Sequence, residues 1–381
     1  MSQRNCLIIA GEKSGEEHCM SFFNELKQNC PDTSFWGVGG DEMKSHGFEC
    51  LYHLNDFSSW GVSEVIGKIP FYFKAFYKIL DEVKKRKTKT AILIDFQDFN
   101  LRLAKKLKKQ GVNVLYYVAP QAWAWKAGRA KALEKSVHTL FTILPFEKQW
   151  FEDRGVTRVR SIAHPLLRTY KESFREIKSK KGEFFQGQKL KLLLLPGSRN
   201  FEVSELLPLF VQSVKELRQL IDIEVRVVKS PSVNPSLYDT YANEVFKFYD
   251  HDKIESALDW ADMSFAASGT VTLMCSLFQV PTIICYRSSL LNEYIYFSFI
   301  SYDGPIGLAN IVHEDYVLPE LIQEQASTYN IVEKAKHWIL NKNAYVNTVE
   351  KLSRTKELVQ GDNKSVPEYM AKVILEELEH V

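Results

Sequence analysis

The feature that most restricts the fold is a repeated alternation between short apolar runs and longer amphipathic segments. Short apolar runs bounded by turns are typical of strands buried on both faces, and the amphipathic segments between them are typical of crossover helices. The alternation therefore predicts an α/β fold with parallel sheets built from βαβ units. The runs expected to form strands are Cys6–Ala10, Ser34–Val38, Ala91–Ile94, Val114–Val118, Leu140–Ile143, Arg158–Ile162, Leu190–Leu195, Ile223–Val228, Met263–Ala266 and Thr282–Tyr286.

A charged and polar stretch over residues 170–188 interrupts the alternation, and the apolar runs then restart. From about Asn330 the chain has the pattern of helices with polar faces. In paired open sheets, ligands bind outside the carboxyl ends of the strands, in the cleft between the domains. The loops that follow the predicted strands are therefore where we expect the chemistry. The predicted domains are 1–180 and 181–345, followed by C-terminal helices over 346–381.

The composition excludes several classes of protein. Lys and Arg number 49 and Asp and Glu number 47, so the net charge of +2 is far below that of a dedicated nucleic-acid-binding protein. No apolar stretch is long enough to predict a transmembrane helix, and the first apolar run is too short for the core of a signal peptide. The six cysteines form no C-x-x-C pair, so we expect no metal site and a reducing, cytoplasmic compartment.

The loop after the first predicted strand combines glycines with a hydroxyl and charged residues at the start of a helix. Glycines permit the close approach of a ligand, and the N–H groups of a helix N-terminus attract anions. Glu12, Ser14 and Gly15 are therefore candidate binding residues. The loop is neither a Walker A loop nor G-x-G-x-x-G, and an ordinary βα turn capped by Ser14 explains it equally well.

Two acidic residues follow the predicted strand Ala91–Ile94. A carboxylate just past a buried strand is well placed to accept the proton of a hydroxyl nucleophile. Asp95 is the better candidate for this general base. Asp98 or Asn100 would equally serve as the cap of the helix that follows.

Tryptophan and histidine mark two further loops of the first half. Trp123 and Trp125 are two residues apart and do not share a helical face, so they form either a wall against a sugar or acyl chain or a local packing contact. His164 follows another predicted strand. A lone histidine is more often structural than catalytic, and both interpretations stay open here.

Two loops of the second half each combine glycine and hydroxyl residues at the start of a helix. The first also carries an arginine, and this combination suits a diphosphate whose charge the arginine would neutralise as it departs. The second is a weaker anion cradle, because Ser-Gly-Thr turns are common. A plain turn with a surface arginine remains the alternative for the first loop. The candidate residues are Gly197, Ser198, Arg199, Ser268, Gly269 and Thr270.

The segment over residues 66–90 is basic and aromatic. It contains eight Lys or Arg and two acidic residues, so its charge is 8 − 2 = +6, and it contains five Phe or Tyr. Such a mixture fits an interfacial helix on anionic lipid. A core-packed helix with a solvated lysine face is the simpler alternative. Nucleic acid is not expected as a partner, because the rest of the chain is not basic.

Taken together, the short sequence motifs in these loops, with several others, resemble those of the lipid-A-disaccharide synthase family. Its members are glycosyltransferases of the two-domain GT-B type (family 19). The strings stand in the family's order over roughly residues 7–323, and the ordered set is specific although each string is weak. The matching strings are Ala10–Glu16, Gly37–Gly40, Gly61–Val65, Ile94–Asn100, Tyr117–Pro120, Trp123–Trp125, Leu144–Glu147, His164–Pro165, Leu195–Arg199 with Glu202, Ser268–Thr270, Asn310 and Pro319–Glu320.

The resemblance implies two Rossmann-like domains that face each other across a cleft, with the acceptor on the N-terminal side and the UDP-sugar donor on the other. It implies an inverting transfer, without metal or cofactor, that joins UDP-2,3-diacylglucosamine to 2,3-diacylglucosamine 1-phosphate. The products would be a β-1,6-linked lipid A disaccharide 1-phosphate and UDP. Asp95 would deprotonate the acceptor 6-hydroxyl, and Arg199 would stabilise the departing UDP.

The resemblance also assigns each of the other candidate residues to the donor or to the acceptor side of the transfer. It implies attachment to the inner membrane from the cytoplasm through residues 66–90, and the family's C-terminal helices make a homodimer a further expectation. Donor-side residues would be Gly197, Ser198, Arg199, Ser268, Gly269, Thr270, Asn310 and Glu320. Acceptor-side residues would be Glu12, Ser14, Gly15, Asp98, Asn100, Trp123 and His164.

The sequence departs from the family's pattern at several positions. Glu16 stands where the family has Asp, and Met274 stands where an acidic residue is expected after the Ser-Gly-Thr turn. In related GT-B enzymes that carboxylate can hold the ribose diol, and methionine cannot accept those hydrogen bonds. Glu320 is a conceivable replacement. Alanine stands at 119, 163 and 309, where the family has Ser, Gly and Pro.

Three alternatives remain beside the synthase. Another GT-B enzyme, such as an N-acetylglucosaminyl transferase or a UDP-sugar epimerase, is disfavoured by the Asp95 string and the basic aromatic segment. A non-catalytic lipid- or nucleotide-binding paralogue is suggested by Met274 and disfavoured by the presence of Asp95, Arg199 and Asn310. A two-lobed solute-binding protein is disfavoured because no signal peptide is predicted.

Overall fold

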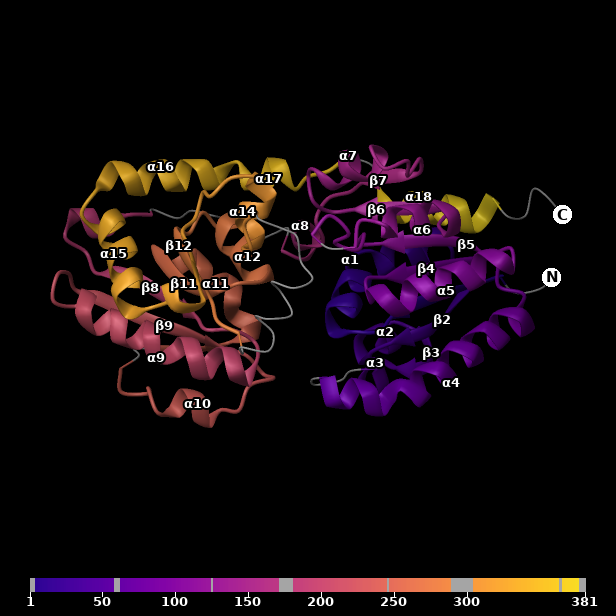
Figure 1. Cartoon of the computed structure of the whole chain (residues 1–381), viewed down its shortest axis with the longest axis horizontal. Helices are drawn as coiled ribbons and strands as arrows, with labels where there is room; N and C mark the ends of the chain where they lie inside the picture. Colours follow the sequence, from indigo (N-terminus) through magenta and orange to yellow (C-terminus); the bar gives the residue numbers. More distant parts are fainter. Residues whose placement is uncertain are drawn as a thin grey trace. The chain divides into compact units, whose positions relative to one another are not determined.

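The chain forms two compact units, which we describe separately (Figure 1). Unit 1 comprises residues 1–169 and 360–381, and unit 2 comprises residues 170–359. Trp125, Gly61, residues 171–180 and the side chains of residues 62–66 lie outside the described part of the structure, although the sequence analysis used them. The computed structural model describes residues 4–57, 62–124, 126–170, 181–244, 247–288, 304–362 and 365–376.

Unit 1 contains a seven-stranded parallel sheet with the order β3-β2-β1-β4-β5-β6-β7. The order reverses between β1 and β4. The carboxyl ends of these two strands therefore form the topological switch point, where open α/β sheets bind their ligands. The strands are β1 Arg4–Ala10, β2 Thr33–Gly39, β3 Glu49–His53, β4 Thr90–Ile94, β5 Asn113–Tyr117, β6 Thr139–Thr142 and β7 Val159–Ser161.

Strand β1 shows why unit 1 has helices on both faces of its sheet. Its side chains alternate between two hydrophobic clusters, with Cys6, Ile8 and Ala10 in one and Leu7 and Ile9 in the other. The first cluster is completed by α1 and α18, and the second by α4, α5 and α6. The helices of unit 1 are α1 Lys13–Asn29, α2 Asp41–Ser45, α3 Leu54–Phe57, α4 Val62–Arg86, α5 Gln97–Lys109, α6 Arg129–Ser136, α7 Glu147–Glu152, α8 Pro165–Thr169 and α18 Val366–Leu375.

Unit 2 contains a six-stranded parallel sheet with the order β10-β9-β8-β11-β12-β13. Its switch point lies between β8 and β11. The strands are β8 Leu190–Leu195, β9 Ile223–Lys229, β10 Lys247–Asp250, β11 Met263–Ala267, β12 Thr282–Tyr286 and β13 Glu320–Ile322. The helices are α9 Asn200–Leu217, α10 Ser236–Asp239, α11 Ile254–Trp260, α12 Thr270–Leu277, α14 Leu308–His313, α15 Thr328–Ile339, α16 Lys342–Ser353 and α17 Thr355–Leu358, with 3-10 turns at Glu183–Gln186, His251–Lys253 and Gln323–Gln325.

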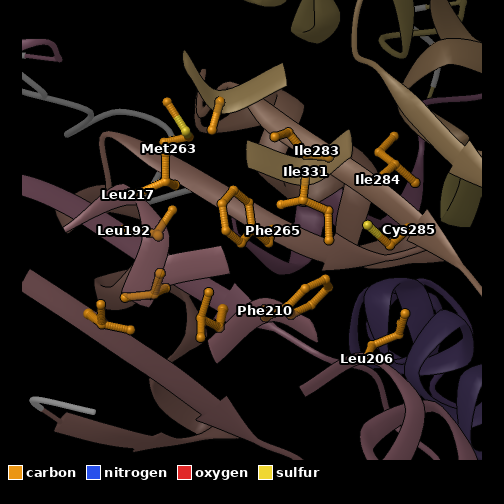
Figure 2. Packing of buried hydrophobic residues seen from close by; sticks show 14 of the residues in the cluster. Leu192, Leu206, Phe210, Leu217, Met263, Phe265, Ile283, Ile284, Cys285 and Ile331 are labelled. Carbon is orange, nitrogen blue, oxygen red and sulfur yellow. The ribbon is translucent and has the colours of Figure 1, made fainter. Parts of the chain in front are cut away.

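The core of unit 2 lies between the central strands and the helices α9 and α15, which pack against each other. Figure 2 shows Phe210 of α9 and Phe265 of β11 pointing toward one another, and their ring centroids are 5.7 Å apart. Leu192, Ile283 and Ile331 belong to the same cluster. Burying side chains of this size contributes roughly 1.5–3 kcal/mol each.

The strands that the sequence analysis did not predict all lie at sheet edges. They are β3 in unit 1 and β10 and β13 in unit 2. An edge strand is covered less completely than a central strand, so it needs no continuous apolar run. Strand β3, for example, has exposed or half-buried residues throughout. Periodicity alone therefore finds every central strand and one edge strand, β7, but misses the other three edge strands.

The C-terminal segment returns to unit 1, where α18 packs against α1 (Figure 1). The Tyr369 hydroxyl lies 2.9 Å from the Thr139 hydroxyl, and the Arg160 guanidinium stacks on the Tyr369 ring at 3.7 Å. Gly361 begins this segment with a φ of +61°, and a Cβ there would lie 2.3 Å from the carbonyl carbon of Ile162. The return of the chain thus depends on a residue without a side chain.

We expect Gly361→Ala to destabilise unit 1 more than Gly111→Ala does. Gly111 also has a positive φ, +76°, but no atom lies within 4 Å of its virtual Cβ. The Gly111 variant therefore reports only the backbone strain, about 1–2 kcal/mol, whereas the Gly361 variant adds a steric clash. The measurement is urea unfolding together with hydrogen exchange of the α18 amides. Equal losses in the two variants would show that the close approach at Gly361 has no energetic weight.

Candidate active site

Strand β4 ends in a strained turn that carries Asp95. Asp95 and Phe96 both have left-handed backbone conformations, with φ of 46° and 44°. Val118, after the neighbouring strand β5, has a φ of 65°, an unfavourable value for a β-branched residue. Non-glycine residues in such conformations cost on the order of 1–3 kcal/mol each and cluster at functional sites.

Hydrogen bonds to main-chain oxygens hold the Asp95 turn. The Tyr116 hydroxyl donates to the Asp95 carbonyl at 3.0 Å. The Asn100 amide donates to the same carbonyl at 2.9 Å and to the Ile94 carbonyl at 3.1 Å. Asn100 is completely buried, so it orders the turn from the interior of unit 1. These contacts fix the main chain of Asp95 and thereby the position from which its side chain extends.

The Asp95 carboxyl lies at the switch point between β1 and β4. Burial, together with the negative charge of Glu12 and against a hydrogen bond from the Phe96 backbone, raises the pKa of Asp95 to about 6. Glu12 belongs to the β1–α1 loop, in which Gly11 packs directly against the Phe96 ring. The two loops that the sequence marked separately therefore meet around Asp95.

The remaining residues of the β1–α1 loop have structural neighbours of their own. Ser14 is exposed in the first turn of α1, and Gly15 packs on Ala10 of β1. Glu16 is buried and accepts hydrogen bonds from the backbone N–H groups of Glu42 and Met43 at 3.0 and 3.1 Å. Its carboxylate thereby caps the N-terminus of α2.

Asp98 lies one turn further along, at the start of α5. Its carboxylate forms a 2.8 Å ion pair with the guanidinium of Arg129, whose side chain is almost fully buried. Arg129 also donates to the side-chain oxygen of Gln97. The pair ties the N-terminal ends of α5 and α6 together, so Asp98 has a structural partner that the sequence did not reveal.

Trp123 is half-buried, with its ring against Phe146 at a centroid distance of 5.1 Å. Its indole N–H donates to Glu147 at 3.1 Å, and the backbone N–H groups of Ile143 and Leu144 donate to the same carboxylate. Burial raises the pKa of Glu147 to about 7, although these three donors favour the charged form. The geometry matches the local-packing interpretation of Trp123 and leaves part of the ring accessible.

His164 is buried beside a second histidine. Burial, together with nearby His18, lowers the pKa of His164 to about 3. Burial likewise lowers the pKa of His18 to about 4. The His164 Nδ1 atom accepts a 3.3 Å hydrogen bond from the Leu166 backbone at the start of α8. A ring this buried and this weakly basic acts as a neutral hydrogen-bond acceptor in this structure.

In unit 2, the loop after β8 is closed by Glu202 of α9. The backbone N–H groups of Ser198 and Arg199 donate to its carboxylate at 2.8 and 3.3 Å. Gly197 lies so close to Glu202 that a Cβ would come within 2.5 Å of it. The Arg199 guanidinium is 75% exposed and pairs with the same carboxylate at 3.2 Å.

The loop after β11 lies at the same switch point. The Ser268 hydroxyl donates to the Ile306 carbonyl at 3.1 Å, whereas Gly269 and Thr270 are exposed at the start of α12. The Thr272 hydroxyl donates to the Gly269 carbonyl and accepts from the Ala309 N–H. The topology thus brings the Pro-Gly-Ser-Arg and Ser-Gly-Thr turns to adjacent strand ends.

Asn310, which is buried, and Glu320, which is half-buried, form one polar network. The Asn310 amide donates to the Leu318 carbonyl and to Glu320, each at 2.8 Å, and its oxygen accepts from the Leu318 N–H. Glu320 also accepts from the N–H groups of Ile306 and Gly307 at 2.9 and 2.8 Å. Met274 is buried in α12. The Glu320 carboxylate is therefore engaged by the backbone N–H groups that precede α14.

One pattern of hydrogen bonds recurs at four places, and the sequence analysis did not predict it. Glu16, Glu147, Glu202 and Glu320 each accept hydrogen bonds from two consecutive backbone N–H groups. One of the loops predicted to bind an anion, Gly197–Arg199, thus binds the protein's own carboxylate. Arg129 and Tyr116 were also missed. A buried arginine at a helix start and a tyrosine in an apolar strand give no sequence signal of their role.

In the described part of the chain, no group of three or more His, Cys, Asp or Glu side chains is arranged to hold a metal ion. The polar groups at the switch point of unit 1 are instead carboxylates, an arginine and amides.

Two doubly wound parallel sheets with polar loops at their switch points define the class of two-domain proteins with the GT-B fold. The solved structure of CalG4, the calicheamicin glycosyltransferase, covers all of this chain and matches it with a TM-score of 0.59 at 14% identity, over 100% of its own length. The UDP-GlcNAc 2-epimerase of Neisseria meningitidis, bound to UDP-GlcNAc, matches with a TM-score of 0.56 at 11% identity, covering 99% of this chain and 100% of that one. These likenesses confirm the predicted fold, which glycosyltransferases and epimerases share.

Sequence comparison decides the family. The family described as lipid-A-disaccharide synthetase matches residues 6–374. The lipid-A-disaccharide synthase of Francisella tularensis (strain WY96-3418) is 31% identical over 365 residues, which cover 92% of this chain and 94% of the relative. The chain belongs to the lipid-A-disaccharide synthase family, so it is a glycosyltransferase of lipid A disaccharide synthesis.

The raised pKa of Asp95 has a consequence for stability. A carboxyl whose pKa is higher in the folded than in the unfolded chain stabilises the fold when protonated, and this contribution is lost as the pH rises from about 4 to about 6. We therefore expect Asp95→Asn to raise the free energy of unfolding by up to about 3 kcal/mol at pH 8, and to have little effect at pH 4. Thermal unfolding of both proteins across this range is the measurement. A stability difference independent of pH would show that Asp95 titrates normally.

Proposed function

We propose that this enzyme joins UDP-2,3-diacylglucosamine to 2,3-diacylglucosamine 1-phosphate, with inversion at the anomeric carbon. The observation that carries the proposal is the Asp95 carboxyl. It lies on a strained turn at the switch point of unit 1, and its pKa is raised to about 6. Perturbed carboxyls in such positions are characteristic of catalytic bases.

Asp95 acts as the general base in this proposal. Near pH 7 its carboxylate is ionised, yet it is more basic than an ordinary aspartate and accepts a proton more readily. It takes the proton of the acceptor 6-hydroxyl as that oxygen bonds to the donor's anomeric carbon. The bond from this carbon to the UDP oxygen breaks on the opposite side, so the configuration inverts. Glu12 keeps the base strong through its neighbouring negative charge.

Unit 2 stabilises the departing UDP in this proposal. Arg199 is exposed and held at the start of α9, so its guanidinium can reach a diphosphate while Glu202 orders the loop behind it. The exposed start of α12, at Gly269 and Thr270, presents N–H groups at the adjacent strand end. Both groups act where negative charge accumulates as the glycosidic bond breaks.

Acylated substrates bring the enzyme to the cytoplasmic face of the inner membrane in this proposal. No described helix is long and apolar enough to cross a bilayer. Helix α4, the core of the segment 66–90, exposes Ile69, Phe73 and Tyr77 by 44%, 56% and 57%. These residues are four apart and therefore form one apolar stripe. The stripe is where α4 would meet the lipid interface.

The pH dependence of turnover tests the base. We expect kcat/KM to rise with pH through about 6 and then level off, because only the ionised Asp95 accepts a proton. Asp95→Asn should lower kcat at least about 100-fold while UDP binding is retained. Steady-state UDP release between pH 5 and 9 gives both values. An Asn variant with near-normal turnover would exclude Asp95 as the base.

Arg199→Ala should lower kcat by on the order of 100-fold or more, about 2.7 kcal/mol or more of transition-state stabilisation, as for the loss of an oxyanion donor. Arg218→Ala is the matched control, because Arg218 lies at the opposite end of α9, paired with Glu244. The single-turnover rate isolates the chemical step. Equal rates in the two variants would exclude a role of Arg199 in the departure of UDP.

The decisive experiment is UDP release by the purified chain in detergent, with both proposed substrates present. Release that needs the acceptor, with a disaccharide 1-phosphate as product, supports the synthase. UDP release without the acceptor would indicate the epimerase-like or hydrolytic chemistry that the shared fold permits. No release from folded protein would move the proposal to a different donor or acceptor.

A further inference from the structure

The carboxyl edge of the unit 2 sheet carries a second arginine. Arg287 directly follows β12, the neighbour of β11 in the sheet, so it extends the row of strand ends that already holds Arg199 and the Ser-Gly-Thr turn. The backbone N–H of Ser268 donates to the Cys285 carbonyl at 3.0 Å, which ties that turn to the end of β12. Arg287 has no part in the function proposed for the chain.

Helix α9 holds both arginines through two glutamates. Glu202 pairs with the Arg199 guanidinium at 3.2 Å, and Glu205 pairs with the Arg287 guanidinium at 3.3 Å. Residues three apart on a helix are neighbours, with their Cβ atoms about 5–6 Å apart. The two guanidinium groups therefore lie close together over the first two turns of α9, although 88 residues separate them in the sequence.

Both guanidinium groups can turn from their glutamates to a ligand. Glu202 also accepts hydrogen bonds from the backbone N–H groups of Ser198 and Arg199, so its charge stays paired when the guanidinium leaves. Glu205 is 40% exposed, so water can solvate its carboxylate in place of Arg287. Among the described residues, Arg287 has no other acidic partner. Since exposed ion pairs contribute little to stability, a multiply charged anion can take this guanidinium from Glu205.

A side-chain bridge fixes the backbone next to Arg287. The backbone N–H of Ser288 donates to the side-chain oxygen of Gln323 at 2.8 Å, and the Gln323 amide donates to the Ser288 hydroxyl at 3.2 Å. Gln323 follows β13 and has a left-handed φ of 52°, a costly conformation that clusters at functional sites. Arg287 also donates to the Ala326 carbonyl at 2.7 Å. The arginine is thus held in place while its side chain stays 29% exposed.

We propose that Arg287 is a second catalytic cation of the transfer and binds the donor's diphosphate together with Arg199. As the bond from the anomeric carbon to the UDP oxygen breaks, its electron pair passes to the diphosphate, and the proton of the acceptor hydroxyl goes to Asp95. Arg287 shares the added negative charge, because a planar guanidinium donates two parallel hydrogen bonds to phosphate oxygens. The inference rests on the proposed function for the identity of its donor.

A purely structural ion pair is the alternative role of Arg287. In that case Arg287 and Glu205 depend on each other equally, and the loss of either side chain has the same effect. Binding of the diphosphate predicts opposite effects instead, because Glu205 competes with the phosphates for the same guanidinium. The two variants of this one pair therefore separate the two roles.

The test compares Arg287→Gln with Glu205→Gln in the full chain. Arg218→Gln is the matched control, since Arg218 also pairs with a glutamate, Glu244, at the far end of α9. Calorimetric titration measures the binding of UDP and of uridine, which has no phosphate, in the absence of acceptor. The single-turnover rate of transfer and thermal unfolding are measured on the same proteins.

We expect Arg287→Gln to weaken UDP binding at least about tenfold, as for the loss of one hydrogen bond between charged groups, and to leave uridine binding unchanged. Its single-turnover rate should fall by on the order of 100-fold, as for the loss of an oxyanion donor. Glu205→Gln should bind UDP at least as tightly as the parent chain, and Arg218→Gln should match the parent in every assay.

Unchanged UDP affinity in Arg287→Gln would overturn the inference. Equal losses of UDP affinity in Arg287→Gln and Glu205→Gln would also overturn it, because the pair would then be structural. A parallel loss of uridine binding would do the same, since the effect would not lie at the phosphates. Failure of the parent chain to bind UDP would contradict the proposed donor itself, and the inference with it.

Discussion

Burial of parallel strands on both faces is the constraint on which the rest of this structure depends. In β1, residues Cys6–Ala10 are fully buried between helices on both sides, and none of them carries a charged or amide side chain. Charged and hydrogen-bonding groups are therefore displaced to the loops at the strand ends. Because all strands of each sheet are parallel, those loops gather at one edge, and the reversal of strand order opens a space there.

The loops at that edge are held by the protein's own carboxylates. Four glutamates each accept hydrogen bonds from two consecutive backbone N–H groups in a loop or in the first turn of a short helix. This changes how the glycine-containing loops are interpreted. A turn that looks suited to a phosphate can be ordered from inside, so that an exposed residue such as Arg199 is left to meet the ligand.

The Asp95 turn combines several costs to stability with a raised pKa of its carboxyl. Two consecutive left-handed residues and a buried carboxyl all disfavour the fold, and Tyr116 and Asn100 offset part of that cost by binding the turn's carbonyls. The same burial makes the carboxyl more basic. The fold is shared with epimerases, so family membership, and not the architecture, separates the chain from other enzymes with the same fold.

The sequence by itself determined the α/β class, the central strands of both sheets and the family, because apolar runs and short ordered strings are local properties. It also singled out Asp95, which follows a strand whose burial is evident from composition. Only the tertiary structure decided what surrounds each candidate. The edge strands, the Asp98–Arg129 pair and the Asn310–Glu320 network join residues through contacts that a local pattern does not encode.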